Sequence, residues 1–279
     1  MSHLDAHCRW MIRAGRSDRT IKLRRQTMQY VQDFIHHDPF AATEAELEDW
    51  QDSLPVSVIR NYTSLVRPYY GWIHAKGYRA DDPAKLLVMP PPRRGIPRPI
   101  ALERLELALR TARPRILPWL LLAGFAGMRA KEIAYLRVED FVVDSGFVMI
   151  HLVRTKGERE RVTAFPRWCW DHIAPMLPEH GPCWARERGS GVVTPQLVSQ
   201  LCNEHLHSIG FADTLHSLRH FAGTEALEAT DNLRLVQEFL GHTSPSTTAI
   251  YTSVRPQRLA KMVDLLPVID LSSPSVDVA

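Results

Sequence analysis

The chain has 279 residues, 45% of them hydrophobic and 23% charged, which is typical of a soluble globular protein long enough for two domains. No apolar run reaches the roughly 18–20 residues of a membrane span, and residues 1–30 are polar and arginine-rich, which excludes a secretory signal there. The net charge is only +3, but residues 1–98 hold 15 Lys/Arg against 11 Asp/Glu. This excess favours an anionic partner for the first third of the chain.

The first predicted elements are amphipathic helices. Residues 19–35 and 57–77 both place apolar side chains at helical spacing. A shorter helix between them opens with the capping signature Thr43-x-x-Glu46, and Gly77 ends the long one. These segments predict a small helical bundle.

Basic residues lie on the polar faces of this bundle, which we place at residues 1–89. Residues 90–99 follow as a connector rich in proline and arginine, which cannot extend a helix. In the polyproline form it could span on the order of 30 Å. A solvated charged face is the alternative reading for any one basic residue. The predicted contacts to an anionic partner are Arg16, Arg19, Lys22, Arg24, Arg25, Arg60, Arg67, Arg93 and Arg94.

After the connector the pattern changes from purely helical to mixed. Residues 115–141 predict a buried helix, a break at Gly127 and a short helix starting near Arg129. Residues 140–166 alternate as strands, and the chain is helical again from Thr194 to about Leu266. The turns between the strands are predicted at 144–146 and 155–157. The predicted fold class is mainly α with a small antiparallel β-sheet (α+β).

Four groups able to address a phosphate occur within residues 216–251. His216 and Arg219 are three residues apart, so they share one helix face, and His242 and Tyr251 follow. Alone, the H-x-x-R spacing is weak evidence. His220 completes an H-x-x-x-H pair that could suggest a metal, but no Glu lies between the histidines and no third ligand follows at a known spacing, which disfavours a metal site.

Cysteine chemistry is disfavoured as well. Cys8, Cys169, Cys183 and Cys202 are scattered without a C-x-x-C pair, which argues against a zinc ribbon and a dense disulfide framework. No histidine context accompanies any of them to favour a thiol hydrolase. We expect these cysteines to be reduced and structural.

The order of four segments resembles the tyrosine recombinase family of phage integrases and Xer-type site-specific recombinases: "GMRAKEIAYLRVEDF", "RTKGERERV", "HSLRHFAGT" and "LGHTSPSTTAIY". The resemblance covers about residues 100–265, and the N-terminal helices look like the core-binding domain of that family. One looser fit is the turn at Asp231-Asn232, where the family has a glycine, but Asn and Asp tolerate turn geometry. The implied organisation is a core-binding domain at 1–89, a linker at 90–99, a catalytic domain at 100–266 and a tail at 267–279.

The resemblance assigns phosphate-binding roles to five residues. Arg129 and Arg219 would grip the non-bridging oxygens with bidentate hydrogen bonds, and Glu132 would support them. His216 would act as base or hydrogen-bond partner, and His242 would donate to the phosphate.

The remaining two roles belong to the nucleophile and the general acid. Tyr251 is the implied nucleophile, a phenol of pKa about 10 that needs neighbouring cations or a proton acceptor. Lys156, in the hairpin turn, would protonate the departing 5′ hydroxyl. Lys131 and Arg154 are nearby alternatives for that role.

The implied function is site-specific recombination of DNA through a 3′-phosphotyrosine link, with no metal, no ATP and no cofactor. The expected partners are double-stranded DNA core or attachment sites, a DNA-bending accessory protein, and three further copies of the chain. The tetramer would form on DNA through the C-terminal segment, which comprises the predicted helix at 256–266 and the apolar "VIDL" of the tail at 268–271. The expected location is the cytoplasm of a bacterial host, on the nucleoid when bound to DNA, and no membrane partner is expected.

Integration or excision of a mobile element is the favoured biological role. Only about 15 residues precede the first long-helix signal, so no separate arm-binding domain is expected. The alternatives are Xer-type dimer resolution, a type IB topoisomerase and a DNA-binding regulator that does not cut. A DNA-binding regulator that does not cut would be expected to have lost at least one catalytic residue. In this sequence all the expected catalytic residue types are present, which disfavours that alternative.

Overall fold

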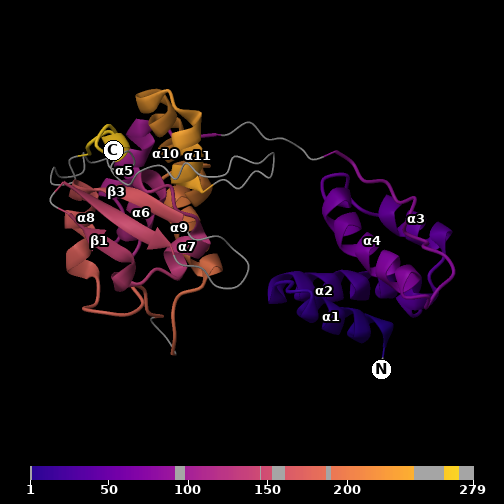
Figure 1. Cartoon of the computed structure of the whole chain (residues 1–279). Helices are drawn as coiled ribbons and strands as arrows, with labels where there is room; N and C mark the ends of the chain where they lie inside the picture. Colours follow the sequence, from indigo (N-terminus) through magenta and orange to yellow (C-terminus); the bar gives the residue numbers. More distant parts are fainter. Residues whose placement is uncertain are drawn as a thin grey trace. The chain divides into compact units, whose positions relative to one another are not determined.

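The computed structural model forms two compact units, Met1–Gly95 (unit 1) and Ile96–Ala279 (unit 2), each with its own hydrophobic core (Figure 1). It describes residues 2–91, 98–144, 146–152, 161–186, 190–241 and 261–269. Within these ranges, no helix combines the length and apolar character that crossing a membrane requires. The predicted fold class, mainly α with a small antiparallel sheet, is confirmed.

Unit 1 is a helical bundle whose core contains Met28, Trp50, Tyr69 and Tyr70, all at most 1% exposed. Its elements are α1 (His3–Arg13), α2 (Asp18–Ile35), the 3₁₀ turn η1 (Pro39–Ala41), α3 (Glu44–Asp52) and α4 (Ile59–Ala75). The capping box predicted for α3 is present, since the Glu46 carboxylate accepts from the Thr43 backbone N–H at 2.8 Å. Helix α1 was not predicted, because two of its three buried positions are His7 and Cys8 rather than large apolar residues.

Arg24 differs from the sequence-based prediction. We expected it on the polar face of α2, but its side chain is buried and 6% exposed. Its Nη1 lies 3.1 Å from Nε2 of His7. Burial lowers the pKa of His7 to about 4, with a smaller contribution from the Arg24 charge, so His7 is neutral at pH 7 and can accept the hydrogen bond. Arg24 therefore joins α1 to α2 instead of facing solvent.

Unit 2 is built around α6 (Leu117–Phe125), in which every residue from Pro118 to Phe125 is buried. A three-stranded antiparallel sheet in the order β1-β2-β3 packs in the same unit (Figure 1). The strands are β1 (Phe141–Val143), β2 (Phe147–Leu152) and β3 (Arg161–Pro166). The helical elements besides α6 are α5 (Leu102–Arg110), α7 (Ala130–Ala134), η2 (Val138–Asp140), α8 (Arg167–Ile173), η3 (Ala174–Met176), α9 (Pro195–Ser208), α10 (Leu215–Thr230) and α11 (Leu233–Leu240).

The chain breaks after α6 as predicted, at Gly127. This glycine has φ +59°, and a Cβ there would lie 2.7 Å from Cδ2 of Leu240. Both the backbone conformation and the close approach of α11 therefore favour glycine. The break turns the chain so that Arg129 becomes the N-cap of α7.

The turn between α10 and α11 uses Asp231 and Asn232 in place of glycine. Asp231 adopts the left-handed conformation, with φ 47°, at the C-cap of α10. The Asn232 side chain then accepts from the backbone N–H of Leu235 at 3.0 Å and caps α11. The expectation that these residues tolerate the turn is confirmed.

All four cysteines are free and buried, one in unit 1 and three in unit 2. Burial raises the pKa of the Cys183 thiol to about 12 and that of the Cys169 thiol well above its ordinary value. The Cys169 and Cys183 thiols are therefore protonated at pH 7, which fits the structural role expected from the sequence.

Candidate active site

Four of the predicted catalytic residues come together in unit 2. Arg129 and Glu132 belong to the start of α7, and His216 and Arg219 lie one turn apart on α10. Lys156, His242 and Tyr251 lie outside the described residues.

The Glu132 carboxylate is the centre of this arrangement. It accepts the backbone N–H of Arg129 at 2.7 Å and the Arg129 Nη1 at 3.1 Å. Arg161 binds both its oxygens, through Nε at 3.0 Å and Nη2 at 2.8 Å. Arg219 Nη1 lies 3.8 Å from Oε2. Three guanidinium groups therefore surround one carboxylate.

Glu132 stays ionised in this environment. Its burial, with a side chain only 13% exposed, opposes ionisation. The hydrogen bonds and charge of Arg161, and the backbone and charge of Arg129, outweigh that burial and lower the pKa to about 2. The group of three arginines and one carboxylate thus carries a net positive charge suited to a phosphate.

The three arginines also bind the carbonyls of the last two residues of α11 and of its C-cap, Gly241. Arg161 donates to Phe239 O at 2.5 Å, Arg219 to Leu240 O at 2.5 Å, and Arg129 to Gly241 O at 3.3 Å. The final carbonyls of a helix have no intrahelical partner and carry partial negative charge, so cationic donors stabilise them. The arginines fix the end of the helix that leads directly into His242.

Arg219 is the most buried of the predicted catalytic residues that the structure describes, with 3% exposure. It also donates to the carbonyl oxygen of Gly127, at the break after α6. Burial, and then the charges of Arg129 and Arg161, lower its pKa to about 9, so it remains protonated at pH 7. Arg129 is more accessible, with a side chain 40% exposed.

His216, one turn before Arg219 on α10, is exposed. Its ring centroid is 4.4 Å from that of His220, at an interplanar angle of 70°. Burial lowers its pKa, with further contributions from His220, Arg219 and Arg129. A neutral imidazole at pH 7 can accept a proton, as the base role predicted from the sequence requires.

Arg161 was not among the residues predicted from the sequence. The signal that could have found it is strand periodicity, because Arg161 lies two residues before Thr163 and four before Phe165, which are buried. An arginine on the buried face of a strand needs a carboxylate partner. Glu132 is that partner.

Comparison with known proteins identifies the family. The profile of the phage integrase family matches residues 102–258, more than half of the chain. The chain belongs to the phage integrase family. This family member is 30% identical to the tyrosine recombinase XerD of Vibrio vulnificus over 251 residues, which cover 84% of this chain and 81% of that protein. Membership confirms the predicted function, a site-specific recombinase that acts as a DNA strand transferase.

Solved structures share the fold. The integrase of mycobacterium phage Brujita matches with a TM-score of 0.53 and 24% identity, over 99% of this chain and 94% of that one. A lambda integrase dimer bound to a COC′ core site matches with a TM-score of 0.68 and 16% identity, over 88% of this chain and 74% of that one. At these identities the likeness establishes the architecture of this integrase family member.

The basic residues predicted to bind DNA fall into three groups in unit 1. Arg16, Arg19 and Lys22 are exposed at the start of α2 and just before it. Other arginines have partners within the unit, and Arg93 and Arg94 lie in the part of the connector that is not described. The partnered contacts are Arg25 to Asp5 at 2.7 Å, Arg60 to Pro90 O, and Arg67 to Lys85 O at 3.0 Å.

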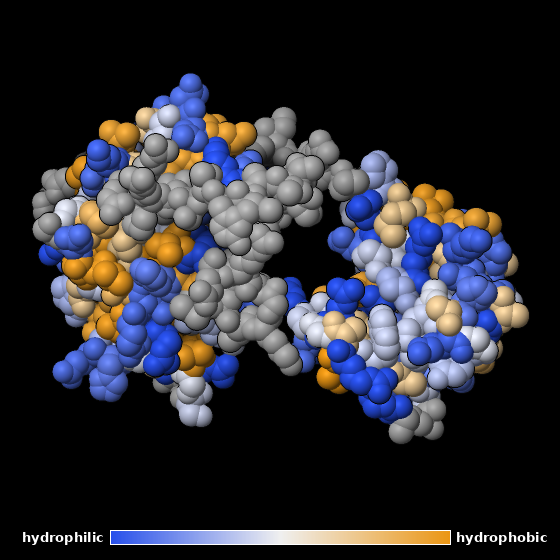
Figure 2. Space-filling view, viewed as in Figure 1, coloured by the Kyte–Doolittle hydropathy of each residue, from blue (hydrophilic) through white to orange (hydrophobic). Residues whose placement is uncertain are grey.

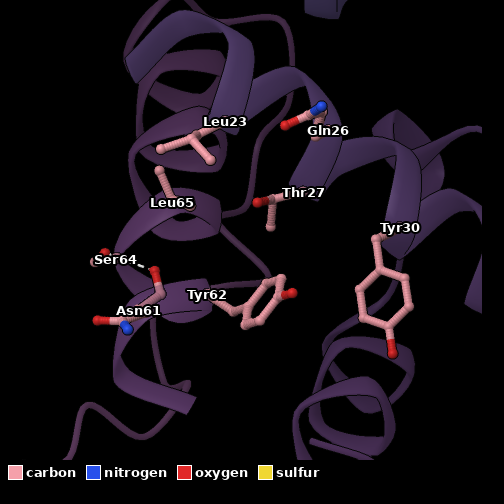
Figure 3. Close-up of a pocket in the computed structure, with 8 residues that line it drawn as sticks. All are labelled: Leu23, Gln26, Thr27, Tyr30, Asn61, Tyr62, Ser64 and Leu65. Atoms are coloured by element: carbon pink, nitrogen blue, oxygen red, sulfur yellow. Dashed lines mark hydrogen bonds between the residues drawn. The ribbon is translucent and has the colours of Figure 1, made fainter. Parts of the chain in front are cut away.

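A pocket lies between α2 and α4 of unit 1. Hydrophilic side chains cover much of the visible face of unit 1 (Figure 2). The pocket has a volume of about 600 Å³, and the rings of Tyr30 and Tyr62 in it have centroids 5.8 Å apart. Figure 3 shows its lining, Leu23, Gln26, Thr27 and Tyr30 from α2 and Asn61, Tyr62, Ser64 and Leu65 from α4. Amide and hydroxyl groups thus alternate with apolar surface in a recess open to solvent.

Proposed function

We propose that the protein cleaves and rejoins duplex DNA at core-type sites, with Tyr251 as nucleophile, to integrate or excise a mobile element. The observation that supports this most is the convergence of Arg129 and Arg219 on Glu132 at the end of α11. Two guanidiniums held at one point match the non-bridging oxygens of a phosphodiester. Tyr251, the predicted nucleophile, lies ten residues after Gly241 in the sequence.

In the proposed cleavage step, the Tyr251 oxygen attacks phosphorus, and the bond from phosphorus to the 5′ oxygen breaks. Arg129 and Arg219 stabilise the charge that develops on the phosphoryl oxygens, His216 takes the phenol proton, and Lys156 protonates the departing 5′ oxygen. The 3′-phosphotyrosine ester retains the bond energy. Attack by the 5′ hydroxyl of a partner strand reverses these steps and rejoins the DNA without ATP or metal.

Covalent trapping tests this function. Nicked duplexes tiled from the DNA that flanks the gene are incubated with wild type and Tyr251→Phe, and then denatured. We expect a protein–DNA adduct with the wild type alone, since the phenylalanine has no nucleophilic oxygen. DNA that is retarded but never linked covalently would point to a regulator that does not cut.

Dimer resolution is the second candidate, because XerD of Vibrio vulnificus matches 84% of this chain. The two roles differ in the DNA that they join. A mobile-element integrase joins two different sites, whereas dimer resolution acts on two copies of one site. Recombination measured between the trapped site and its identical copy, and between that site and host chromosomal sequences, separates them.

We propose that unit 1 binds DNA through α2 and α4. In this proposal Arg16, Arg19 and Lys22 contact phosphates, and Gln26 and Asn61 contact base edges.

Variants of Lys22 and Gln26 make a matched pair of tests, since both residues lie on α2. Lys22→Ala should weaken binding to all DNA sequences by a similar factor. It should also reduce the slope of log affinity against log salt concentration by about one, because one phosphate contact is lost. Gln26→Ala should reduce the free-energy difference between the preferred and the other bases by about 1–3 kcal/mol at one base pair of the site. Binding titrations over a salt series and against a base-substituted panel measure both effects. Equal losses on every sequence for both variants would contradict base reading by Gln26.

We propose that four copies assemble on two DNA sites by exchanging the C-terminal segment. In the described part of this segment, Met262, Val263, Leu266 and Ile269 are buried in the core of unit 2. The same apolar side chains could occupy the equivalent surface of a neighbouring copy, which gives the exchange a driving force. Leu265 and Val268 are exposed, at 59% and 73%.

Truncation after Pro256 tests the exchange. The truncated protein should bind a single site with affinity close to wild type but fail to pair two sites, because its connecting segment is missing. Gel retardation measures the first property, and a two-site synapsis assay measures the second. Full recombination by the truncated protein would refute the proposal.

A further inference from the structure

Arg161 holds Glu132 and the end of α11 together from a third element, β3. Its side chain is 6% exposed, and its three nitrogens donate to both oxygens of Glu132 and to Phe239 O. Gly241 packs directly against it, since a Cβ on Gly241 would collide with Cδ of Arg161. Arg161 is therefore enclosed, and all three of its guanidinium nitrogens already have protein acceptors.

The three arginines share the Glu132 carboxylate unequally. Arg161 takes both carboxylate oxygens in a bidentate pair, whereas Arg219 lies 3.8 Å from the carboxylate and Arg129 makes a single side-chain contact with it at 3.1 Å. A carboxylate that lost Arg161 would remain buried beside two cations and would pair with them instead. Those are the two guanidiniums assigned to the phosphate.

We propose, resting on the recombinase function above, that Arg161 is a positioning residue for strand cleavage. It keeps Glu132 occupied so that Arg129 and Arg219 remain available to the scissile phosphate. Through Phe239 it also fixes the end of α11 from which residue 242 continues. The Thr163 hydroxyl, on the same face of β3, lies 3.1 Å from Ala126 O and 3.3 Å from Phe239 O, and its single proton is shared between these two carbonyls.

The test measures the rate of adduct formation per bound complex on the nicked duplex that traps the wild type. Arg161→Met should slow this rate ten- to a hundredfold, the effect expected of a misplaced reacting group, while DNA affinity changes less than twofold. Arg161→Lys should be slowed about tenfold, because an ammonium cannot reproduce the bidentate pair. Arg167→Met is the matched control, because Arg167 at the start of α8, directly after β3, is 43% exposed and pairs with Asp171, and this variant should cleave like wild type.

A double variant separates positioning from a general structural role. Arg161→Met with Glu132→Gln removes the carboxylate charge that would capture Arg129 and Arg219, so it should cleave at least tenfold faster than Arg161→Met alone. A double variant no faster than Arg161→Met would overturn the proposal.

Folding and the proposed function are checked independently. If Arg161→Met does not fold, Arg161→Lys is used instead. A rate of adduct formation equal to that of wild type in Arg161→Lys would overturn the inference. Absence of any adduct with wild type would refute the recombinase proposal itself. An adduct with wild type and an equal rate for folded Arg161→Met would refute only the role of Arg161.

Discussion

Arg219→Ala should reduce the rate of strand cleavage by roughly 10²–10³ while leaving DNA affinity nearly unchanged. Two N–H donors of Arg219 bind the carbonyls of Gly127 and Leu240, and the guanidinium has five such donors in total. A phosphate would take the others, with the group already oriented by those two carbonyls. This preorganisation is what makes the expected loss large.

The measurement is single-turnover adduct formation at saturating protein, with affinity determined separately by titration. Arg219→Lys tests geometry, because it keeps the positive charge but not the planar fork, and it should also cleave poorly. Arg234→Ala is the control, since Arg234 lies on α11, is 58% exposed and pairs with Glu238. A fall in binding with unchanged cleavage per bound complex would mean that Arg219 only positions the DNA.

Glu132→Ala should lower the free energy of unfolding of unit 2 by about 3–5 kcal/mol, the usual cost of removing one partner from a buried ionic group. Arg161 and Arg219 would then remain buried with their charges uncompensated. Glu132→Gln should cost less, because its amide oxygen can still accept one hydrogen bond. Denaturant titration at pH 7 measures both effects.

The same residue should give stability a pH dependence at low pH. The pKa of Glu132 is about 2 in the folded protein and 4.5 in its ordinary state, so the carboxylate contributes its full stabilisation above about pH 4.5. That contribution is lost as the pH falls from 4.5 toward 2. The difference in unfolding free energy between wild type and Glu132→Gln should therefore shrink over this range. A difference that stays constant from pH 7 to pH 3 would contradict the assignment of this pKa to Glu132.

Sequence reasoning was most successful where local chemistry decides the structure. The capping box of α3 and the turn at Asp231-Asn232 depend on residues adjacent in the chain, and both occur as expected. The break at Gly127 was also predicted, although the reason for glycine there includes a long-range contact with Leu240. The motif order identified Arg129, Glu132, His216 and Arg219, which the structure brings together.

The parts that sequence reasoning missed depend on tertiary partners. Arg24 looked like a surface arginine because its helix is rich in basic residues, yet its partner His7 comes from a separate helix. Arg161 occurs among charged residues in "GERERV", and its partners Glu132 and Phe239 lie 29 and 78 residues away in the sequence. Helix α1 was missed because a buried histidine and a buried cysteine do not produce an apolar stripe.

The buried cysteines provide a natural reporter for local opening. A thiol reagent reaches Cys8 only when unit 1 opens, and it reaches Cys169, Cys183 and Cys202 only when unit 2 opens. Mass spectrometry of the labelled peptides would then give two separate opening rates from one unmodified protein. Comparing those rates with and without DNA would show how much each unit is stabilised by the duplex, without any engineered label.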